Sequence, residues 1–272
     1  MGAAFFGVFL VGGIIALIVA ASSSAKEKRL RWLAAAAELL GGEHDRSSKA
    51  WGTKLGPKVT YELATRGAGS SAESWTHIHV DVPKKYPLAV HVRRQGRRDH
   101  ALVARGEMVD VLVGDRAFDD AFLIEAAPAD VVRLLLDAEV RRLLALHGES
   151  DLDTVDRPDG TRALVLGIRG WIEDPALAAE PIQVMARLGS RVRDAYAAAD
   201  ADLAKGDAPG DPYRPVVDDR PARTAQVGRE AEVEKVKGLR AERDARANAV
   251  AWTVIGVVFA IILLSVCATL PR

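Results

Sequence analysis

The chain of 272 residues contains one cysteine, Cys267, and this scarcity excludes two classes of protein. A disulfide within the chain needs two cysteines, and zinc modules built on thiolates need several. The chain also has no excess of either positive or negative charge, because 37 Lys and Arg residues balance 37 Asp and Glu residues. Binding to nucleic acid without regard to sequence requires a broad positive field. The balance therefore predicts that nucleic acid is not a partner.

Sequence motifs of the common enzyme classes are also missing. The chain has no G-x-S-x-G and no H-E-x-x-H pattern, and residues 67–71 lack the lysine and the following helix of a phosphate-binding loop. The three carboxylates of residues 115–120 do not follow a calcium-loop spacing, and Phe118 and Phe122 beside them indicate a structural turn. We therefore expect no catalytic residue and no cofactor, and favour a protein that is not an enzyme.

Long tracts near both ends of the chain contain no charged residue. Residues 1–25 carry none, and residues 249–270 form an apolar tract of 22 residues. A helix of about 20 residues is long enough to cross the hydrocarbon core of a bilayer. The sequence therefore predicts one transmembrane helix at 1–25 and another at 249–270. A cleaved signal peptide ending at Ser23-Ser24-Ala25 is the alternative for the first tract.

Basic residues lie on the inner flanks of the two tracts and predict an orientation. Ten flank the tracts on the side of the chain's middle, and Arg272 alone lies beyond them: Lys26, Lys28, Arg29, Arg31, Arg229, Lys235, Lys237, Arg240, Arg243 and Arg246. Such residues stay on the cytoplasmic side of a membrane. The pattern predicts a multi-pass protein of the bacterial inner membrane, with the lipid bilayer as partner and the middle of the chain in the cytoplasm.

The middle of the chain divides by composition into four segments. We expect a juxtamembrane helix at 26–42, an α+β domain at 43–204, a proline-rich linker at 205–222 and a charged juxtamembrane helix at 223–248. The linker segment contains prolines, glycines and charges but few residues that form a core.

Periodicity within residues 43–204 predicts strands first and helices later. Apolar residues alternate with polar ones at 59–63, 78–82, 88–92 and 109–113, and short strands are expected at 122–124 and 162–169. Helical spacing covers 128–146, where Asp137 interrupts the helix by capping its second piece, and a further helix starts at Asp174-Pro175 and reaches about Leu203. This order predicts an α+β fold with a mainly antiparallel sheet and packed helices, flanked by a transmembrane helix at each terminus.

Three histidines form the most specific local pattern. His77 and His79 share the face of their strand opposite Ile78 and Val80. If residues 83–87 form a hairpin turn that pairs Val82 with Leu88, His79 faces His91 across the two strands. Cross-strand neighbours lie about 5 Å apart, within reach of a shared metal ion. His77, His79 and His91 are therefore candidate metal ligands, with an ordinary polar sheet face as the competing interpretation.

A resemblance rests on the segment Gly114-Asp115 … Phe118-Asp119 … Phe122-Leu123-Ile124, followed by residues 134–141. This G-D-x-x-F-D-x-x-F segment before a leucine-rich helix resembles one that recurs in uncharacterised bacterial membrane-anchored proteins. The resemblance covers about 30 residues and implies an α+β region beside membrane helices, but it assigns no activity.

Two functional hypotheses follow from these patterns. The first is a non-enzymatic bacterial membrane protein whose α+β domain binds an unidentified protein or the membrane surface. The alternative is a membrane-tethered metal-binding or enzymatic domain that uses the strand face of His77, His79 and His91.

Overall fold

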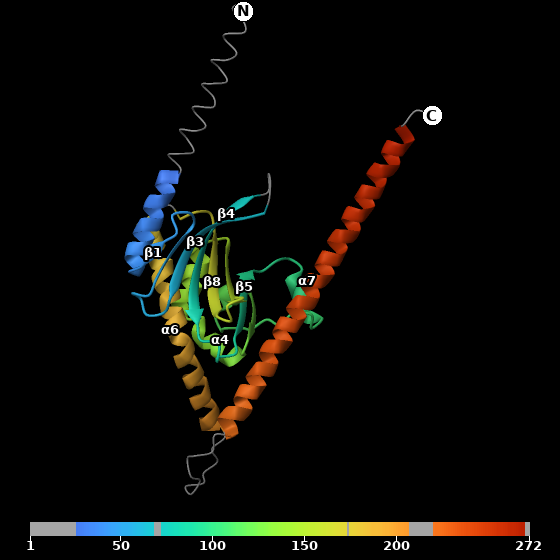
Figure 1. Ribbon diagram of the computed structural model, residues 1–272. Coiled ribbons are helices and arrows are strands. Elements are labelled where there is room, and N and C mark those ends of the chain that lie inside the picture. Colours follow the sequence, from blue (N-terminus) through green and yellow to red (C-terminus); the bar gives the residue numbers. More distant parts are fainter. Residues whose placement is uncertain (1–25, 68–71, 173, 207–219, 270–272) are drawn as a thin grey trace, which may run out of the picture.

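The computed structural model contains one eight-stranded antiparallel sheet. Figure 1 shows helices packed around this sheet. The structure describes residues 26–67, 72–172, 174–206 and 220–269. The strands follow the order β1-β2-β3-β4-β8-β7-β5-β6, and every neighbouring pair is antiparallel. The predicted α+β fold with a mainly antiparallel sheet and packed helices is confirmed.

The elements have the following bounds. The strands are β1 (Glu43–His44), β2 (Lys49–Gly52), β3 (Val59–Arg66), β4 (Glu73–Val82), β5 (Ala89–Arg94), β6 (Phe122–Ala127), β7 (Ser150–Asp156) and β8 (Arg162–Arg169). A helix covers residues 26–40. The further helices are α2 (Asp99–Ala104), α3 (Arg116–Asp119), α4 (Ala129–Leu135), α5 (Ala138–Leu146), α6 (Pro175–Gly206) and α7 (Arg220–Thr269).

One face of the sheet is covered by helices and forms the core. Alternate residues of β3 and β4, including Tyr61, Ile78 and Val80, are fully buried beneath α6, because side chains on a strand point to opposite faces in turn. Gly189 of α6 lies against Val80, and a Cβ atom on this glycine would come 2.3 Å from the Cγ2 atom of Val80. The close approach of α6 to β4 therefore depends on the missing side chain.

The helix boundaries follow the capping signals of the sequence. Asp137 accepts a hydrogen bond of 3.0 Å from the backbone N–H of Val140, which separates α4 from α5 as predicted. Asp174 accepts a bond of 2.9 Å from the N–H of Ala176 at the start of α6. Satisfying these N–H groups, which have no partner within the helix, sets where α5 and α6 begin.

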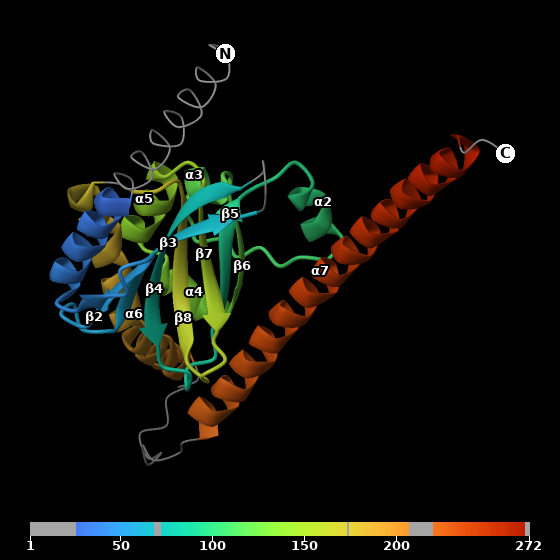
Figure 2. The same ribbon diagram turned by 45° about the horizontal axis from the view of Figure 1, so that its top comes forward.

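Helix α7 lies on the other face of the sheet, along β5 and β6 (Figures 1 and 2). Its apolar contact is small, since only Val233 and Val236 pack against Ala89 and Ala127 in this cluster. Ion pairs supply most of the remaining contact: Arg229–Asp130, Arg229–Asp200, Lys237–Asp156, Arg240–Asp153 and Arg243–Glu125. The charged half of α7 thus forms ion pairs with acidic side chains of the sheet and of helices α4 and α6.

The predicted membrane topology is wrong. Within the part of the chain that the structure describes, no helix is both long and apolar enough to cross a membrane. Residues 249–269 of the apolar tract do not form a separate helix. They are the end of α7, a helix of 50 residues whose charged first half forms ion pairs with the sheet, and residue 270 lies outside the described residues. The predicted C-terminal transmembrane helix, multi-pass topology and inner-membrane localisation are thereby overturned. The transmembrane helix predicted at residues 1–25 lies outside the described residues.

One local prediction also needs correction, and one stays untested. Residues 109–113 form no ladder strand: the N–H of Val111 bonds to the carbonyl of Ile124, but the Asp110 side chain accepts the N–H of Ile124 in place of a backbone oxygen. At the predicted linker, α6 continues to Gly206 and α7 starts at Arg220, while residues 207–219 lie outside the described residues.

Candidate metal centre

Two neighbouring strands bring one carboxylate and two imidazoles together on the sheet face opposite α6. Glu62 of β3 is directly opposite His77 of β4, and Thr60 is opposite His79. All three side chains are half-buried, and the residues between the histidines and beside Glu62 point into the core. One donor atom from each of Glu62, His77 and His79 lies within 4.8 Å of the other two. This spacing suits three ligands of one metal ion.

Glu62 is held as a carboxylate by its neighbours. Its Oε2 atom lies 3.1 Å from Nε2 of His79, and its Oε1 atom lies 3.3 Å from Nζ of Lys49. The hydrogen bond with His79 lowers the pKa of Glu62 to about 2, and the charge of Lys49 adds to this effect while partial burial opposes it. Glu62 is therefore ionised at neutral pH and available as an anionic ligand.

His77 is held as a neutral imidazole. Arg66 donates a hydrogen bond of 3.1 Å from Nε to Nε2 of His77, so this ring nitrogen acts as the acceptor. Burial, together with the positive charge of Arg66, lowers the pKa of His77 below its usual value. A neutral ring has a lone pair for a metal ion, but the Arg66 N–H already uses it.

Arg66 is itself fixed by two further contacts. Its guanidinium lies 3.9 Å above the ring of Trp75, and its Nη1 atom donates a bond of 2.8 Å to Asp151 of β7. The ion pair passes over Gly167 of β8, where a Cβ atom would come 2.1 Å from Oδ1 of Asp151. A glycine in the middle of a strand is typical of such a close approach.

His91 does not join His77 and His79. β5 pairs with β6 and β7, so His91 lies opposite Glu125 and Asp153, while β4 pairs with β3 and β8. The predicted hairpin is wrong, because β8 and β7 lie between β4 and β5 in the sheet. Two strands therefore separate His79 from His91, and the set of three candidate ligands changes to Glu62, His77 and His79.

His91 instead lies beneath α7. Its Nδ1 atom is buried, has no hydrogen-bond partner among the described residues and is 3.6 Å from Oδ2 of Asp153. At this distance the contact is an ion pair only when the imidazole is protonated, and it is too long for a hydrogen bond. Arg240 already binds Asp153 through two bonds of 2.7 Å. His91 thus belongs to the contact between α7 and the sheet.

The other features singled out in the sequence have structural partners. Asp115 caps α3 by accepting the N–H of Phe118, and Asp119 accepts the N–H groups of Val113 and Gly114. These contacts agree with the structural interpretation of the acidic segment. Of residues 67–71, only Gly67 is among the described residues.

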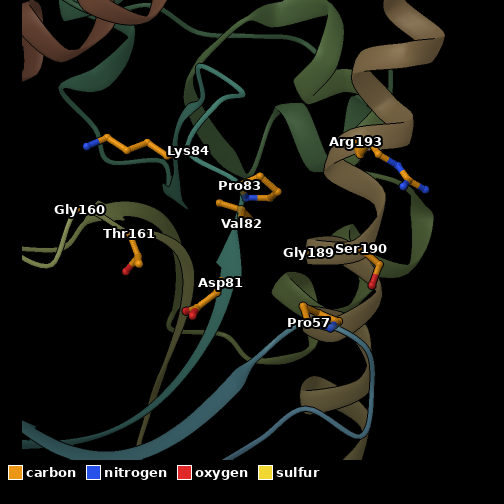
Figure 3. A pocket seen from close by; sticks show the side chains of 10 residues that line it. All are labelled: Pro57, Asp81, Val82, Pro83, Lys84, Gly160, Thr161, Gly189, Ser190 and Arg193. Carbon is orange, nitrogen blue, oxygen red and sulfur yellow. The ribbon is translucent and has the colours of Figure 1, made fainter.

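A hollow of about 600 Å³ lies at the end of β4 that carries Val82, between the β7–β8 turn and α6 (Figure 3). Lys84 and Arg193 on its rim point away from each other, and Asp81 is bound by Arg157 at 2.6 Å. Among the described residues that line it, no three His, Cys, Asp or Glu side chains converge as metal ligands would. The hollow is thus a weaker candidate for a functional site than the strand pair.

Comparison with known proteins adds no assignment: no family model matches the chain, and no curated protein matches it. The resemblance to bacterial membrane-anchored proteins through residues 114–141 therefore stays a prediction. The function has to be argued from the geometry of the sheet face.

Proposed function

We propose that this protein binds a divalent transition-metal ion through Glu62, His77 and His79. The observation that carries the proposal is the mutual distance of their donor atoms, all within 4.8 Å. Two imidazoles and one carboxylate form a ligand set that suits zinc and its neighbours in the first transition row, and it leaves coordination positions open.

The charges of the ligands at neutral pH support this proposal. A metal ion binds a deprotonated carboxylate and a neutral imidazole, and proton competition weakens its binding at other protonation states. The lowered pKa values of Glu62 and His77 supply these two forms without a proton being released. Calcium and magnesium are disfavoured, because they prefer sites built from oxygen ligands alone.

The neighbouring cations set a limit on the affinity. Arg66 has to give up its bond to Nε2 of His77 before a metal ion takes that lone pair, and Lys49 competes for the carboxylate of Glu62. Each displaced contact lowers the net binding free energy by the value of a hydrogen bond, about 1 kcal/mol. We therefore expect moderate affinity, as in a site that exchanges its metal.

The test is a titration of the full chain with Zn²⁺ by calorimetry after chelator treatment. His79→Gln removes one ligand while the strand keeps its polar face, and we expect a loss of affinity of at least about tenfold, because loss of even an outer-shell partner of a metal ligand costs about that much. His100→Gln is the matched control, because His100 lies on α2 and contacts Gln95. Equal zinc affinity in the wild-type protein and in His79→Gln would disprove the proposal.

The hypothesis of a non-enzymatic protein that binds another protein stays a prediction. One observation favours it: five large apolar side chains on the last part of α7 are each at least 50% exposed, namely Val250, Trp252, Ile255, Val258 and Ile261. Exposed apolar patches of this kind mark interaction sites. Metal binding is the more specific proposal because it names its ligand atoms.

A further inference from the structure

A second site of different chemistry lies between α3, the start of β6 and α5, on the side of the molecule where α3 and α5 meet in Figure 2. The hollow has a volume of about 270 Å³. It is separate from the metal centre, since no residue that lines it belongs to β3 or β4. This volume is slightly below the range found for sites of drug-sized molecules, about 300–1,000 Å³, so the hollow would suit a smaller ligand.

The floor of this hollow is aromatic. Phe118 and Phe122 stack with their ring centroids 4.5 Å apart and an angle of 13° between the rings. Both residues are buried, so the rings are fixed by the core beneath them. The walls carry only small apolar side chains, namely Ala117, Ala121, Ala138 and Ala145. A compact apolar group would be in contact on several sides here.

The rim of the hollow is cationic. Arg94, Arg141 and Arg142 line it, while Asp115 is the one acidic residue in the lining. Asp115 accepts a bond of 3.1 Å from Nε of Arg141, and Glu180 outside the lining binds Arg142. Three guanidinium groups are thus matched by two carboxylates, which leaves one positive charge without a partner.

Arg94 carries that remaining charge. Its Nε atom donates a bond of 3.0 Å to the carbonyl of Gly148, and its guanidinium lies 4.9 Å from the centre of the Phe122 ring. No carboxylate of the residues that the structure describes lies within ion-pair distance of Arg94. The carbonyl and the ring hold the guanidinium in place, and its remaining N–H donors are unused by these contacts.

We propose that this hollow binds a small organic carboxylate with a compact apolar body. The apolar body would contact Phe118 and Phe122, and the carboxylate would accept charge-assisted hydrogen bonds from Arg94 and Arg141. A guanidinium matches the planar carboxylate in shape and charge. Inorganic phosphate is disfavoured because it has no apolar body to contact Phe118 and Phe122.

The experiment is a titration of the full chain with benzoate, followed by the shifts of its amide resonances or by calorimetry. We expect saturable binding at millimolar concentration or below, and weaker binding of benzyl alcohol and inorganic phosphate. Arg94→Gln should weaken benzoate binding by about tenfold through loss of the charge-assisted bonds. Ala145→Phe, at an exposed helix position that lines the hollow, should abolish it by filling the space.

Arg97→Gln is the matched control, since Arg97 is exposed on the neighbouring loop, lies outside the lining and changes the net charge by the same amount. Unchanged benzoate affinity in Arg97→Gln, with the loss confined to Arg94→Gln and Ala145→Phe, would support the proposal. Three outcomes would overturn it: no saturable benzoate binding, equal weakening in Arg97→Gln, or binding of benzyl alcohol as tight as that of benzoate. Thermal midpoints of all variants distinguish lost binding from lost folding.

Discussion

Arg243 of α7 donates two hydrogen bonds, of 2.8 and 2.7 Å, to the carboxylate of Glu125, which is 1% exposed on β6. The two residues are 118 positions apart in the chain. A carboxylate buried to this degree is costly unless it is paired and hydrogen-bonded. The position of α7 and the burial of Glu125 therefore depend on each other.

Replacing Arg243 with Leu should destabilise the folded protein by about 3 kcal/mol, because it leaves the Glu125 carboxylate buried without its partner. Urea unfolding measures this difference. Arg246→Leu is the control: Arg246 is on the same helix, but its side chain is 64% exposed, and its loss should cost less than about 1 kcal/mol. Adding Glu125→Leu to Arg243→Leu should restore part of the stability. A double variant as unstable as the sum of the single changes would contradict this account.

Replacing Gly189 with Ala tests how closely α6 packs on β4. Alanine favours a helix over glycine by about 1 kcal/mol. At this position, however, the new Cβ would lie 2.3 Å from the buried Val80 side chain. We expect the clash to prevail, with a net loss of about 1–2 kcal/mol in the free energy of unfolding.

Gly238→Ala provides the matched comparison within α7. Gly238 is also helical, but apart from its chain neighbours and the backbone of its own helix no atom lies within 4 Å of the position its Cβ would take. This change should stabilise the protein by up to about 1 kcal/mol. The same sign of effect for both glycines would refute the packing argument.

The elements that the sequence predicts well are those whose signals are local. Alternating apolar residues indicate β3, β4 and β8, and Asp137 and Asp174 mark where α5 and α6 begin. These features depend on side-chain periodicity and on hydrogen bonds between residues a few positions apart. They are set before any tertiary contact is considered.

β7 is missing from the sequence prediction because its stabilising partners are remote. The strand carries three aspartates and only two large apolar residues, Leu152 and Val155. Its charges are compensated by α7, where Lys237 binds Asp156 and Arg240 binds Asp153 at separations of 81 and 87 residues. Periodicity within a short window contains no trace of such pairs.

The candidate site can be predicted only in part, again because contacts between residues far apart in the chain leave no local signal. Alternation along β4 correctly places His77 and His79 on one face, and it places Glu62 on the polar face of β3. Alternation does not reveal which strands are neighbours. The ligand set predicted from the sequence therefore contains His91 and lacks Glu62. Strand order is decided by pairing across the whole sheet, here by β8 and β7 entering between β4 and β5.

Acidification should weaken the contact among β7, β8 and α7 through Asp156. Hydrogen bonds from Arg162 lower the pKa of Asp156 to about 2, against the effect of burial and with a further contribution from Lys237. A depressed carboxyl pKa contributes stability above the unfolded value, about 3.9, and this contribution is lost as the pH falls towards the folded value.

The measurement compares the thermal midpoints of wild-type protein and Asp156→Asn at neutral pH and between about pH 4 and pH 2. The wild-type advantage should be largest at neutral pH and shrink across the acidic window. Asp120→Asn is the control, because Asp120 is 73% exposed and pairs only with the exposed Arg116 in the described part of the chain. An advantage of wild type over Asp156→Asn that is independent of pH would exclude the ionised carboxylate as its source.

Replacing Arg66 with Gln should tighten zinc binding at the proposed metal centre. In the wild-type protein the Nε–H of Arg66 occupies the lone pair of His77 that a metal ion needs, and its positive charge opposes the approach of a cation. Removing one such hydrogen bond changes the free energy by about 0.5–1.5 kcal/mol, which corresponds to roughly two- to tenfold tighter binding. Calorimetric titration with Zn²⁺ measures the change.

Arg157→Gln controls for the loss of charge, because Arg157 binds Asp81 on the same face of β4 and is not hydrogen-bonded to either histidine. A gain in affinity of the same size in Arg157→Gln would assign the effect to net charge. Weaker binding in Arg66→Gln would show instead that Arg66 supports the ligand geometry, and it would remove Arg66 as a competitor of the metal.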